Sequence, residues 1–474
     1  MYEYIIGLEV HCELMTHTKM FSPSPVSFGK EPNTMVNEID LGMPGIMPCL
    51  NKKGVEYALR VCHALHMDID ELVVFDRKNY YYSDLTKGFQ ITQQEHPIGK
   101  NGYLDINVDG KIKRISIERL HMEEDTAKQL HYSDYSLIDY NRSGIPLIEI
   151  VSEPVINSGK EAMLYLEKLR QIFLYTEVSD ARLEEGSMRC DVNVSVRKKG
   201  TDILGTKCEI KNLNSMSNVA KAIDYEAKRH IQLIEEGKEV LQETRRYDEA
   251  SKQTVLMRSK GDAVDYKYYR EPNILPIRLD HQWVENIKQS LPMMMDERYE
   301  LYTETYHLPS NEARTLVEHK DLSDFFNECL EYCSDDQILS HYMVGDVQAY
   351  LNKHNLSIKE SMLKPSDLGK LIDLIHNKEI SSAQGKKVFN IMMEEGKDPL
   401  KIIEENHMRL IRDEDELKVI INQILDDHPK SIDDYKKGKT KVIGYLVGQL
   451  MKETHGQSDP EIGRKLIGEI LDER

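Results

Sequence analysis

The sequence predicts an α+β protein in which a first domain of mixed strands and helices precedes two domains built only from helices. Three observations predict this fold class. Residues 188–196 alternate apolar and polar side chains, as a half-buried strand does. Residues 163–173 and 219–234 instead space their apolar side chains three and four apart, as amphipathic helices do. After residues 293–295 the strand alternation stops, and amphipathic helical segments follow one another.

Two further segments of the first domain also alternate like strands. Residues 8–14 direct Leu8, Val10, Cys12 and Leu14 to one face and polar residues to the other, and residues 207–211 alternate in the same way. Each of these strands therefore has one core face and one polar face. His11 and Cys12 are neighbours and point in opposite directions, so we expect Cys12 in the core rather than at a reactive site.

The helical half of the chain divides again. We expect domains at 1–293, 294–404 and 405–474, because 474 residues exceed what one core usually serves. The helical domain contains amphipathic segments at 322–333 and 365–375. In the last segment, a lysine tract at 435–441 leads into a helix with apolar residues on one side, which predicts a small helical tail.

Composition excludes several classes of protein. The formal net charge is −19, and a general DNA-binding protein needs clustered Lys and Arg to neutralise phosphates. Surplus carboxylates suit a magnesium site, although a solvated acidic surface accounts for most of them. No apolar stretch is long enough to cross a membrane, and the seven cysteines form no C-x-x-C pair. We therefore expect a cytoplasmic protein with reduced thiols.

Polar residues on the predicted strands are the first candidates for chemistry. Glu9 and His11 are two residues apart, so their side chains share a face and can converge on a metal ion or a substrate. Asp191 lies between Arg189 and Asn193 on the polar face of an apolar strand, which suits a cation site beside an anion site. An exposed polar strand face explains the first pattern without a ligand, and a structural ion pair explains the second.

A second set of candidates lies at strand ends. Glu123, Glu124 and Asp125 form a carboxylate run after a strand-like segment, and such runs are also typical of solvated turns or of the first turn of a helix. Glu185 precedes Gly186, which allows the backbone to turn tightly into the strand at 188–196. These positions alone do not distinguish a metal site from a solvated turn.

Two basic pairs are candidates for phosphate contact. Arg77 and Lys78 precede three tyrosines, and Arg245 and Arg246 precede Tyr247. Arginine suits bidentate contact with phosphate. The sequence has no G-x-x-x-x-G-K-S/T phosphate loop, no G-x-G-x-x-G turn and no G-x-S-x-G nucleophile elbow. A bound nucleotide would therefore occupy a less common cradle.

Nine ordered segments resemble the B subunits of the aspartyl/glutamyl-tRNA amidotransferases over essentially the whole chain. They are IIGLEVHCEL (5–14), EPNTMVNEIDLGMPG (31–45), DRKNYYYSDLTKGFQITQ (76–93), RLHMEEDTAK (119–128), DYNRSGIPLIEIVSEP (139–154), EEGSMRCDVNVSVR (184–197), KCEIKNLNS (207–215), QETRRYDE (242–249) and YKKGKTKVIGYLVGQLMK (435–452). The resemblance implies a cradle-shaped first domain with a mixed, largely antiparallel sheet and the kinase and transamidase site. It also implies a helical domain and a tail that binds tRNA.

The resemblance further implies an enzyme, a carbon–nitrogen ligase that uses glutamine as the amide donor. In such enzymes ATP phosphorylates the carboxylate of Glu or Asp esterified to tRNA(Gln) or tRNA(Asn), and ammonia then displaces phosphate. A carboxylate needs a good leaving group before it transfers its acyl carbon, and Mg²⁺ neutralises charge while the phosphoryl group moves. The implied partners are misacylated tRNA, a glutaminase (A) subunit that supplies ammonia through a channel, and a small bridging (C) subunit.

The resemblance also implies roles for individual residues of this chain. Glu124, Arg189, Asp191 and Lys211 are implied to be catalytic, and Arg189, Lys211, Arg245 and Arg246 are implied to contact ATP. The implied Mg²⁺ ligands, direct or through water, are Glu9, His11, Glu124, Glu149, Glu185, Asp191 and Glu209. The implied tRNA contacts are Lys436, Lys437, Lys439 and Lys441.

The chain departs from the family pattern at several positions. Many members carry a four-cysteine zinc knuckle where this chain has Ser22, Ser24, Asn37 and Asp40, so we expect no structural zinc. Residues 268–273 and 341–344 also differ from the usual motifs. A tRNA-binding adaptor without turnover is the main alternative function, and dependence on ATP distinguishes it. A ligase acting on a small free acid is a second alternative, and dependence on aminoacylated tRNA distinguishes that one.

Overall fold

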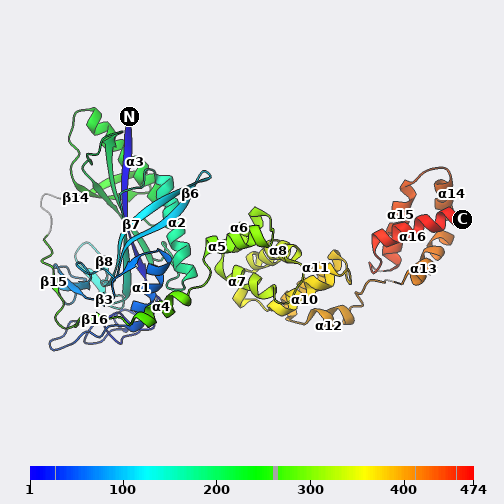
Figure 1. Ribbon diagram of the computed structural model, residues 1–474, viewed down its shortest axis with the longest axis horizontal. Coiled ribbons are helices and arrows are strands. Elements are labelled where there is room, and N and C mark those ends of the chain that lie inside the picture. The colour runs from blue at the N-terminus through cyan, green and yellow to red at the C-terminus, as the bar shows by residue number, and fades with distance from the viewer. Residues whose placement is uncertain (27, 260–264, 412, 455) are drawn as a thin grey trace. The chain divides into compact units, whose positions relative to one another are not determined.

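The computed structural model describes residues 1–474 except 27, 260–264, 412 and 455. The chain divides into two compact units, Met1–Met294 and Met295–Arg474, which are described separately below. Figure 1 shows strands and helices together in the first unit and helices in the second. The predicted α+β class, with an N-terminal mixed-sheet domain and a helical C-terminal region, is confirmed.

A nine-stranded sheet forms the centre of the first unit. Every neighbouring pair of its strands is antiparallel except β12 and β13, which are parallel. The sheet is therefore mixed and largely antiparallel. Its strands, in spatial order, are β14 (Gln253–Ser259), β13 (Glu243–Asp248), β12 (Cys208–Lys211), β11 (Met188–Lys198), β1 (Tyr2–Glu13), β10 (Pro146–Ser152), β7 (Lys111–Glu124), β6 (Gly99–Val108) and β2 (Asp68–Ile69).

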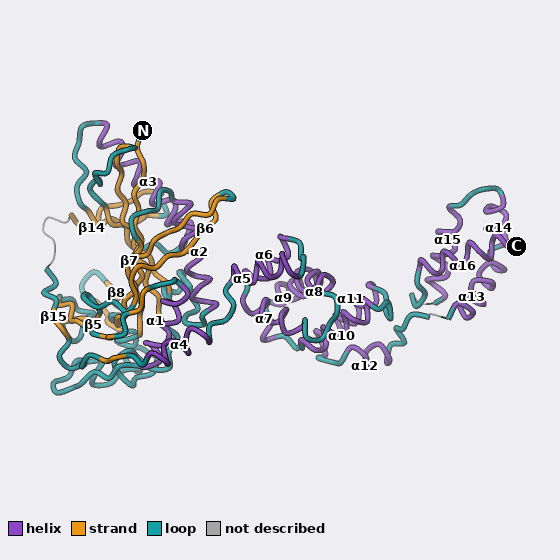
Figure 2. The backbone as a smooth tube through the Cα atoms, in the orientation of Figure 1, coloured by secondary structure: helices purple, strands orange, loops and turns teal. Residues whose placement is uncertain are grey.

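Short strands and helices complete the described part of the first unit. A three-stranded sheet and two strand pairs contain β15 (Tyr269–Arg270), β4 (Asp76–Asn79), β5 (Phe89–Thr92), β16 (Ile277–Arg278), β3 (Leu72–Val73), β8 (Lys128–His131) and β9 (Ser136–Asp139). The helices are α1 (Lys52–Ala64), α2 (Gly159–Tyr175), α3 (Met216–Glu235) and α4 (His281–Gln289). In Figure 2, α2 and α4 lie on one side of the large sheet and β5, β8 and β15 lie on the other.

The alternation that predicted the central strands determines which face of the sheet is buried. Leu8, Val10 and Cys12 of β1, and Val192 and Val194 of β11, are fully buried in a core that also contains apolar residues of all four helices. Burial of this apolar face is the main favourable term in folding. The polar residues between them necessarily point to the other face of the sheet. Cys12 is in the core, as predicted.

The predicted helices begin at polar caps. Ser158 and Ser215 precede α2 and α3, and their hydroxyls accept hydrogen bonds from the backbone N–H groups of Glu161 and Asn218. These bonds satisfy donors that have no partner inside the helix. One face of each helix packs against the sheet, as the sequence spacing predicts.

All the named elements of the described part of the second unit are helical. In chain order they are α5 (Met295–Glu300), η1 (Leu301–Thr305), α6 (Ser310–Glu318), α7 (Lys320–Cys329), α8 (Asp336–Tyr342), η2 (Met343–Val347), α9 (Gln348–His354), η3 (Ile358–Glu360), α10 (Pro365–His376), α11 (Ser382–Glu395), α12 (Pro399–Glu405), α13 (Glu414–Asp427), α14 (Pro429–Lys436), α15 (Lys441–Glu453) and α16 (Pro460–Glu473).

The described residues of the second unit form two hydrophobic cores. One includes buried residues from Tyr302 to Ile403, and the other includes buried residues from Leu417 to Leu471. Separate cores are consistent with our division near residue 404, and the three-domain division remains our proposal. Within the described residues, none of the helices combines the length and apolar character needed to cross a bilayer.

Candidate active site

Carboxylate and imidazole side chains gather on the polar face of the large sheet. They come from β1, β7, β10, β11 and β12, strands that are distant in sequence but adjacent in the sheet. His11 of β1 is paired with Glu149 of β10, which is paired with His121 of β7. Glu9 of β1 is paired with Asp191 of β11. Side chains on one face of neighbouring strands are within contact distance, so the strand register creates the site.

The first cluster consists of His11, Glu123 and Glu149, and is called the His11 group here. The Nε2 atom of His11 lies 3.3 Å from a Glu149 oxygen and 3.5 Å from a Glu123 oxygen. His121 lies beside the group, with its Nε2 atom 3.2 Å from Glu149 and 3.7 Å from Glu123. Two carboxylates are therefore held close together by two imidazoles.

The charges of the His11 group shift one another's protonation. Burial opposes the charged form of His121, but Glu149 and Glu123 outweigh burial and raise the pKa of His121 to about 9. The same carboxylates raise the pKa of His11. Burial also opposes ionisation of Glu149, yet the two imidazoles hold its pKa well below the usual range. The protonated imidazoles thus supply the positive charge that balances the two carboxylates.

The second cluster consists of Glu9, Asp191 and Glu209, and is called the Glu9 group here. One ligand oxygen from each residue lies within 4.8 Å of the others. Burial, together with the like charges of Glu149, Asp191 and Glu209, raises the pKa of Glu9, and Asn193 Nδ2 donates a 2.8 Å hydrogen bond to its Oε1.

Lys211 neutralises part of the Glu9 group. Its Nζ atom lies 3.0 Å from Oε1 of Glu209 and is hydrogen-bonded to Asp191. These two carboxylates outweigh burial and raise the pKa of Lys211. The ammonium therefore stays charged at the position where two carboxylates converge.

Arg189 is fixed at the edge of the same face. Its Nη2 atom lies 2.6 Å from Asp125 and 3.7 Å from Glu13. Burial opposes ionisation of Asp125, but Arg189 and Arg142 hold its pKa below the usual value. Burial and the charge of Asp125 raise the pKa of Glu13 to about 8. Arg189 thus adds a permanent positive charge to a carboxylate-rich face.

Lys78 is a further cation whose charge is stabilised by the carboxylates of the His11 group. Its Nζ atom lies 4.8 Å from the ring centroid of Tyr266 and 6.0 Å from that of Tyr80. Burial opposes its charge, but Glu123, Tyr268 and Glu149 raise the pKa of Lys78. The sequence indicated Lys78 as a phosphate contact, whereas its partner Arg77 is occupied by Glu271 at 2.5 Å.

Glu124 does not join either cluster. Its oxygens lie 2.5 and 2.6 Å from Nζ of Lys87, and Oε1 accepts a 3.0 Å hydrogen bond from the backbone of Ile91. It follows Glu123 in the same strand, so the two side chains point to opposite faces. The assignment of Glu124 to metal binding and catalysis stays a prediction, and the geometry favours Glu123 instead.

Two other predicted residues also lie outside the clusters. Glu185 is in the loop before β11 and forms an exposed pair with Arg182 at 2.6 Å. Arg245 donates to Thr254 and to Glu243, at 3.0 and 2.7 Å. The roles predicted for Glu185 and Arg245 are therefore untested and gain no support from the geometry.

Arg246 points the opposite way from Arg245. In the β12–β13 register it is paired with Lys211, and its side chain is about half exposed. Adjacent strand residues point to opposite faces, so Arg246 is directed toward the face that carries the Glu9 group. Its predicted contact with ATP fits this position.

His121 was not among the predicted site residues and Glu123 was named only as part of a carboxylate run, although the spacing of apolar residues around both carried a signal. In β7 the buried apolar residues are Ile115 and Ile117, and after that Leu120 and Met122. This change from odd to even positions coincides with a register shift where β7 meets β10. A β-bulge reverses which residues face the core beyond it. It therefore places His121 and Glu123 on the polar face.

The positions of the family's zinc knuckle contain a hydrogen-bonded ion pair. The Asp40 carboxylate accepts a 2.7 Å hydrogen bond from Ser22, and it lies 3.2 Å from Nζ of Lys19. It also accepts from the backbone N–H of Asn37. These buried residues supply a hydroxyl, one carboxylate and an ammonium, a set that does not match the thiolate and imidazole ligands of structural zinc.

The predicted tRNA-contacting lysines lie at the end of α14, in the turn that follows it and at the start of α15. All four are exposed. Lys439 pairs with Asp434 at 2.9 Å, and Lys436 donates to the backbone oxygen of Arg474. The tract thus forms an exposed basic turn in a tail that also contains acidic residues. Contact with tRNA stays a prediction for the four lysines, which are Lys436, Lys437, Lys439 and Lys441.

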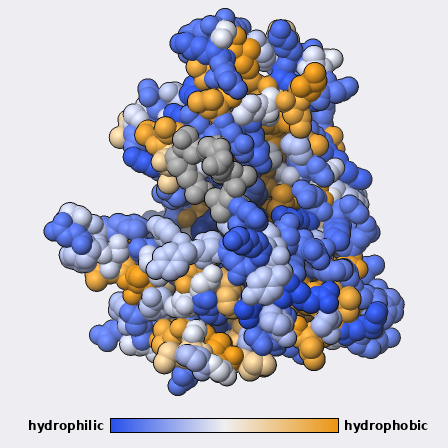
Figure 3. All heavy atoms as spheres, turned by 90° about the vertical axis from the view of Figure 1, so that its left-hand side faces the viewer, coloured by the Kyte–Doolittle hydropathy of each residue, from blue (hydrophilic) through white to orange (hydrophobic). Residues whose placement is uncertain are grey.

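The donor atoms of the two clusters fit a divalent cation. The Glu9 group offers only carboxylate oxygens, the ligands that Mg²⁺ prefers. The His11 group offers two carboxylates and one imidazole, a set that Mn²⁺ and Zn²⁺ also accept. Large parts of the face seen in Figure 3 are hydrophilic, with hydrophobic residues scattered among them.

Comparisons with known proteins match the entire chain. Residues 4–285 match the model of the GatB/GatE catalytic domain, and residues 324–471 match that of the GatB domain. Aspartyl/glutamyl-tRNA(Asn/Gln) amidotransferase B subunits of Macrococcus caseolyticus, Staphylococcus carnosus and Staphylococcus aureus are each 48% identical over 473 residues. The alignments cover 100% of this chain and 100% of each relative.

Proposed function

The chain belongs to the family of aspartyl/glutamyl-tRNA(Asn/Gln) amidotransferase B subunits, and on this premise we propose that it carries out ATP-dependent, tRNA-dependent transamidation. Its substrates are Glu-tRNA(Gln), Asp-tRNA(Asn) or both. The side-chain carboxylate accepts a phosphoryl group from ATP, ADP leaves, and ammonia then displaces phosphate to give the amide. The enzyme is a carbon–nitrogen ligase with glutamine as the amide donor.

The observation that carries this proposal is the pair of acidic clusters on one sheet face. Phosphoryl transfer to a carboxylate brings several negative oxygens together, and it needs positive charge at fixed positions. The Glu9 group and the His11 group provide two cation sites, and Arg189, Lys211 and Arg246 provide fixed or mobile positive side chains around them. A structural role alone would not need two carboxylate clusters on one face.

We assign Mg²⁺ to the Glu9 group and the His11 group. When bound, Mg²⁺ neutralises the phosphate oxygens and polarises the phosphoryl group. Arg189 is held by Asp125, so it can orient an anionic oxygen at the edge of the site without losing its own position. Lys211 and Arg246 are paired on β12 and β13, and this register supports their assignment as contacts for the phosphates of ATP.

The proposed partners follow from the family, and the buried cysteines agree with them. Cys12, Cys62, Cys190 and Cys208 are buried, and burial raises the pKa of each thiol, so these cysteines are poor nucleophiles for glutamine hydrolysis. We assign ammonia production to a glutaminase (A) subunit, assembled with a small bridging (C) subunit. This chain alone should release no ammonia from glutamine, and release by the purified chain would contradict this division of labour.

The experiment measures ATP hydrolysis and amide formation by the chain assembled with the other two subunits. Glu-tRNA(Gln), Asp-tRNA(Asn) and uncharged tRNA are compared while Mg²⁺ is varied. We expect one or both misacylated tRNAs to stimulate both reactions in a Mg²⁺-dependent way. If neither stimulates ATP hydrolysis although tRNA still binds, the chain is a tRNA-binding adaptor and the proposal fails.

A further inference from the structure

Strand β13 presents different chemistry on its two faces. Thr244 is 1% exposed, and its Oγ1 atom donates a 2.9 Å hydrogen bond to Oε2 of Glu209. The two residues are directly paired in the β12–β13 register. Arg245, the next residue, points to the opposite face toward α3. β13 therefore touches the Glu9 group with one face and a separate buried network with the other.

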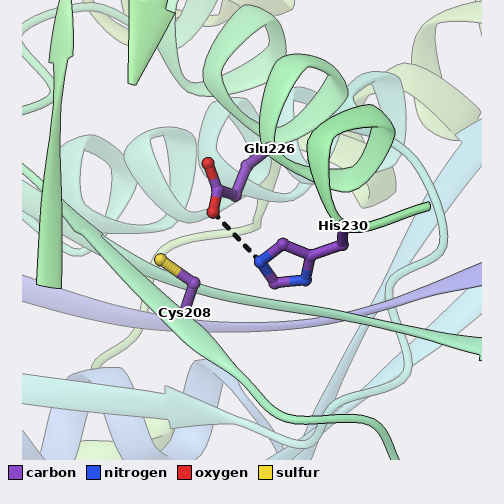
Figure 4. Close-up of side chains that lie close together, drawn as sticks. All are labelled: Cys208, Glu226 and His230. Atoms are coloured by element: carbon purple, nitrogen blue, oxygen red, sulfur yellow. Dashed lines mark hydrogen bonds and ion pairs between the residues drawn. The ribbon is translucent and has the colours of Figure 1, made fainter. Parts of the chain in front are cut away.

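The separate network is centred on Glu226 of α3 and is called the Glu226 hub here. Its carboxylate accepts hydrogen bonds from His230 at 3.0 Å, Arg229 at 2.6 Å and Thr254 at 2.5 Å. Figure 4 shows Glu226 and His230 on α3, with Cys208 of β12 beside them. The donors outweigh burial and lower the pKa of Glu226.

The positive charge at the Glu226 hub comes from the protein itself. Arg229 donates to one carboxylate oxygen, and Arg245 lies 3.6 Å from the other. Two guanidinium groups therefore neutralise the Glu226 carboxylate, as a cation bound between Cys208, Glu226 and His230 would. The Arg245 side chain also donates to Thr254, which ties β13 to β14. The hub therefore fixes Arg245 on the face of β13 that points away from Thr244 and the Glu9 group.

We propose that Thr244 is a positioning residue for the Glu9 group, because its hydroxyl orients the carboxylate of Glu209 for cation binding. One oxygen of Glu209 accepts from Thr244 and the other faces Lys211. A carboxylate fixed in this way loses less conformational freedom when it binds a cation. Groups that hydrogen-bond to metal ligands commonly tune affinity in this manner. The inference rests on the proposed Mg²⁺ role of the Glu9 group.

The test removes the hydroxyl and keeps the shape of the side chain. We expect Thr244→Val to raise the Mg²⁺ concentration for half-maximal ATP hydrolysis by roughly tenfold or more. Thr244→Ser retains a hydroxyl and should stay close to the unsubstituted complex. Binding of Mn²⁺, measured by electron paramagnetic resonance on the same complexes, should weaken in parallel. If Thr244→Val does not assemble, Thr244→Ala also lacks the hydroxyl and carries the same expectation.

Thr254→Val is the matched control. Thr254 is a buried threonine on the neighbouring strand, and it donates to Glu226 rather than to Glu209. This variant should lower the thermal midpoint but leave the Mg²⁺ and Mn²⁺ dependence unchanged. An unchanged Mn²⁺ affinity in Thr244→Val would overturn the inference, as would an equal loss of affinity in Thr254→Val. If the unsubstituted complex lacked Mg²⁺-dependent ATP hydrolysis, the proposed function would fail instead, while the Mn²⁺ titration would still test Thr244.

Discussion

Replacing Glu124 by Gln should destabilise the first unit while leaving its Mg²⁺ requirement unchanged. The Glu124 side chain is 5% exposed and that of Lys87 is 11% exposed, and both Glu124 oxygens lie within 2.6 Å of the ammonium. The variant leaves the ammonium with no counter-charge from Glu124. Breaking a buried ion pair by removing one partner costs about 3–5 kcal/mol. The long Lys87 stem lets its head move toward water, so we expect about 3 kcal/mol.

The assay for Glu124→Gln is thermal unfolding followed by calorimetry. A loss of about 3 kcal/mol in a unit of this size corresponds to a fall in Tm of roughly 5 °C. The double variant Glu124→Gln, Lys87→Met removes both charges and should recover much of this loss, because an apolar replacement leaves no uncompensated ion. A Tm equal to that of the unsubstituted chain, together with lost ATP hydrolysis, would refute the structural reading and restore Glu124 to the catalytic site.

Three other predictions concern the clusters and the tail. Glu123→Gln should raise the Mg²⁺ requirement for ATP hydrolysis by at least about tenfold, and an unchanged titration would contradict its place in the His11 group. The second prediction concerns Tm measured with a metal chelator present. The carboxylates raise the pKa of His121 from 6.5 in the unfolded chain to about 9, so the stability from the protonated imidazole is complete below pH 6.5. It is lost as the pH rises through about 9, and Tm should fall over that interval. A flat profile, or the same fall in His121→Gln, would contradict this account. The third prediction concerns the salt dependence of tRNA binding, measured as the slope of log affinity against log salt concentration. Reversing four charges in the lysine tract should make this slope shallower by roughly 3, whereas reversing four charges elsewhere in the tail should leave the slope unchanged. An equal change of slope in the two variants would mean that the tail attracts tRNA through its overall charge and not through the lysine tract. The tract variant changes Lys436, Lys437, Lys439 and Lys441, and the control changes Lys418, Lys430, Lys452 and Lys465.

The sequence could predict the strands because burial imposes a period of two residues. The alternation in β1 and β11 identifies the core face, and it places Glu9, His11 and Asp191 on the opposite face. The order of strands in the sheet could not be obtained in this way. Periodicity specifies which side of a strand is buried, whereas pairing depends on long-range contacts. Glu149 is therefore implied by the family resemblance alone.

Two expectations gain no support from the structure because neighbouring side chains in a strand point to opposite faces. Arg245 and Arg246 were treated as one basic pair, although neighbouring side chains in a strand point to opposite faces. Glu123 was passed over for Glu124 because the bulge in β7 reverses the alternation before the carboxylate run. The expectation for Glu185 gains no support for another reason. Glu185 lies in a loop, where no periodic pattern relates the sequence position to the direction of the side chain.

We expect Lys211 to connect cation binding with nucleotide binding in the Glu9 group. Without a cation its ammonium lies between Asp191 and Glu209, and its charge offsets their repulsion. A divalent cation that binds these carboxylates competes with Lys211 for the same oxygens, because both neutralise the same negative charge. The displaced ammonium then becomes available to phosphate, beside Arg246 on the neighbouring strand. Mg²⁺ and the phosphates of ATP should therefore bind this face cooperatively, since Mg²⁺ replaces the positive charge that the carboxylates lose and phosphate replaces the negative charge that Lys211 loses.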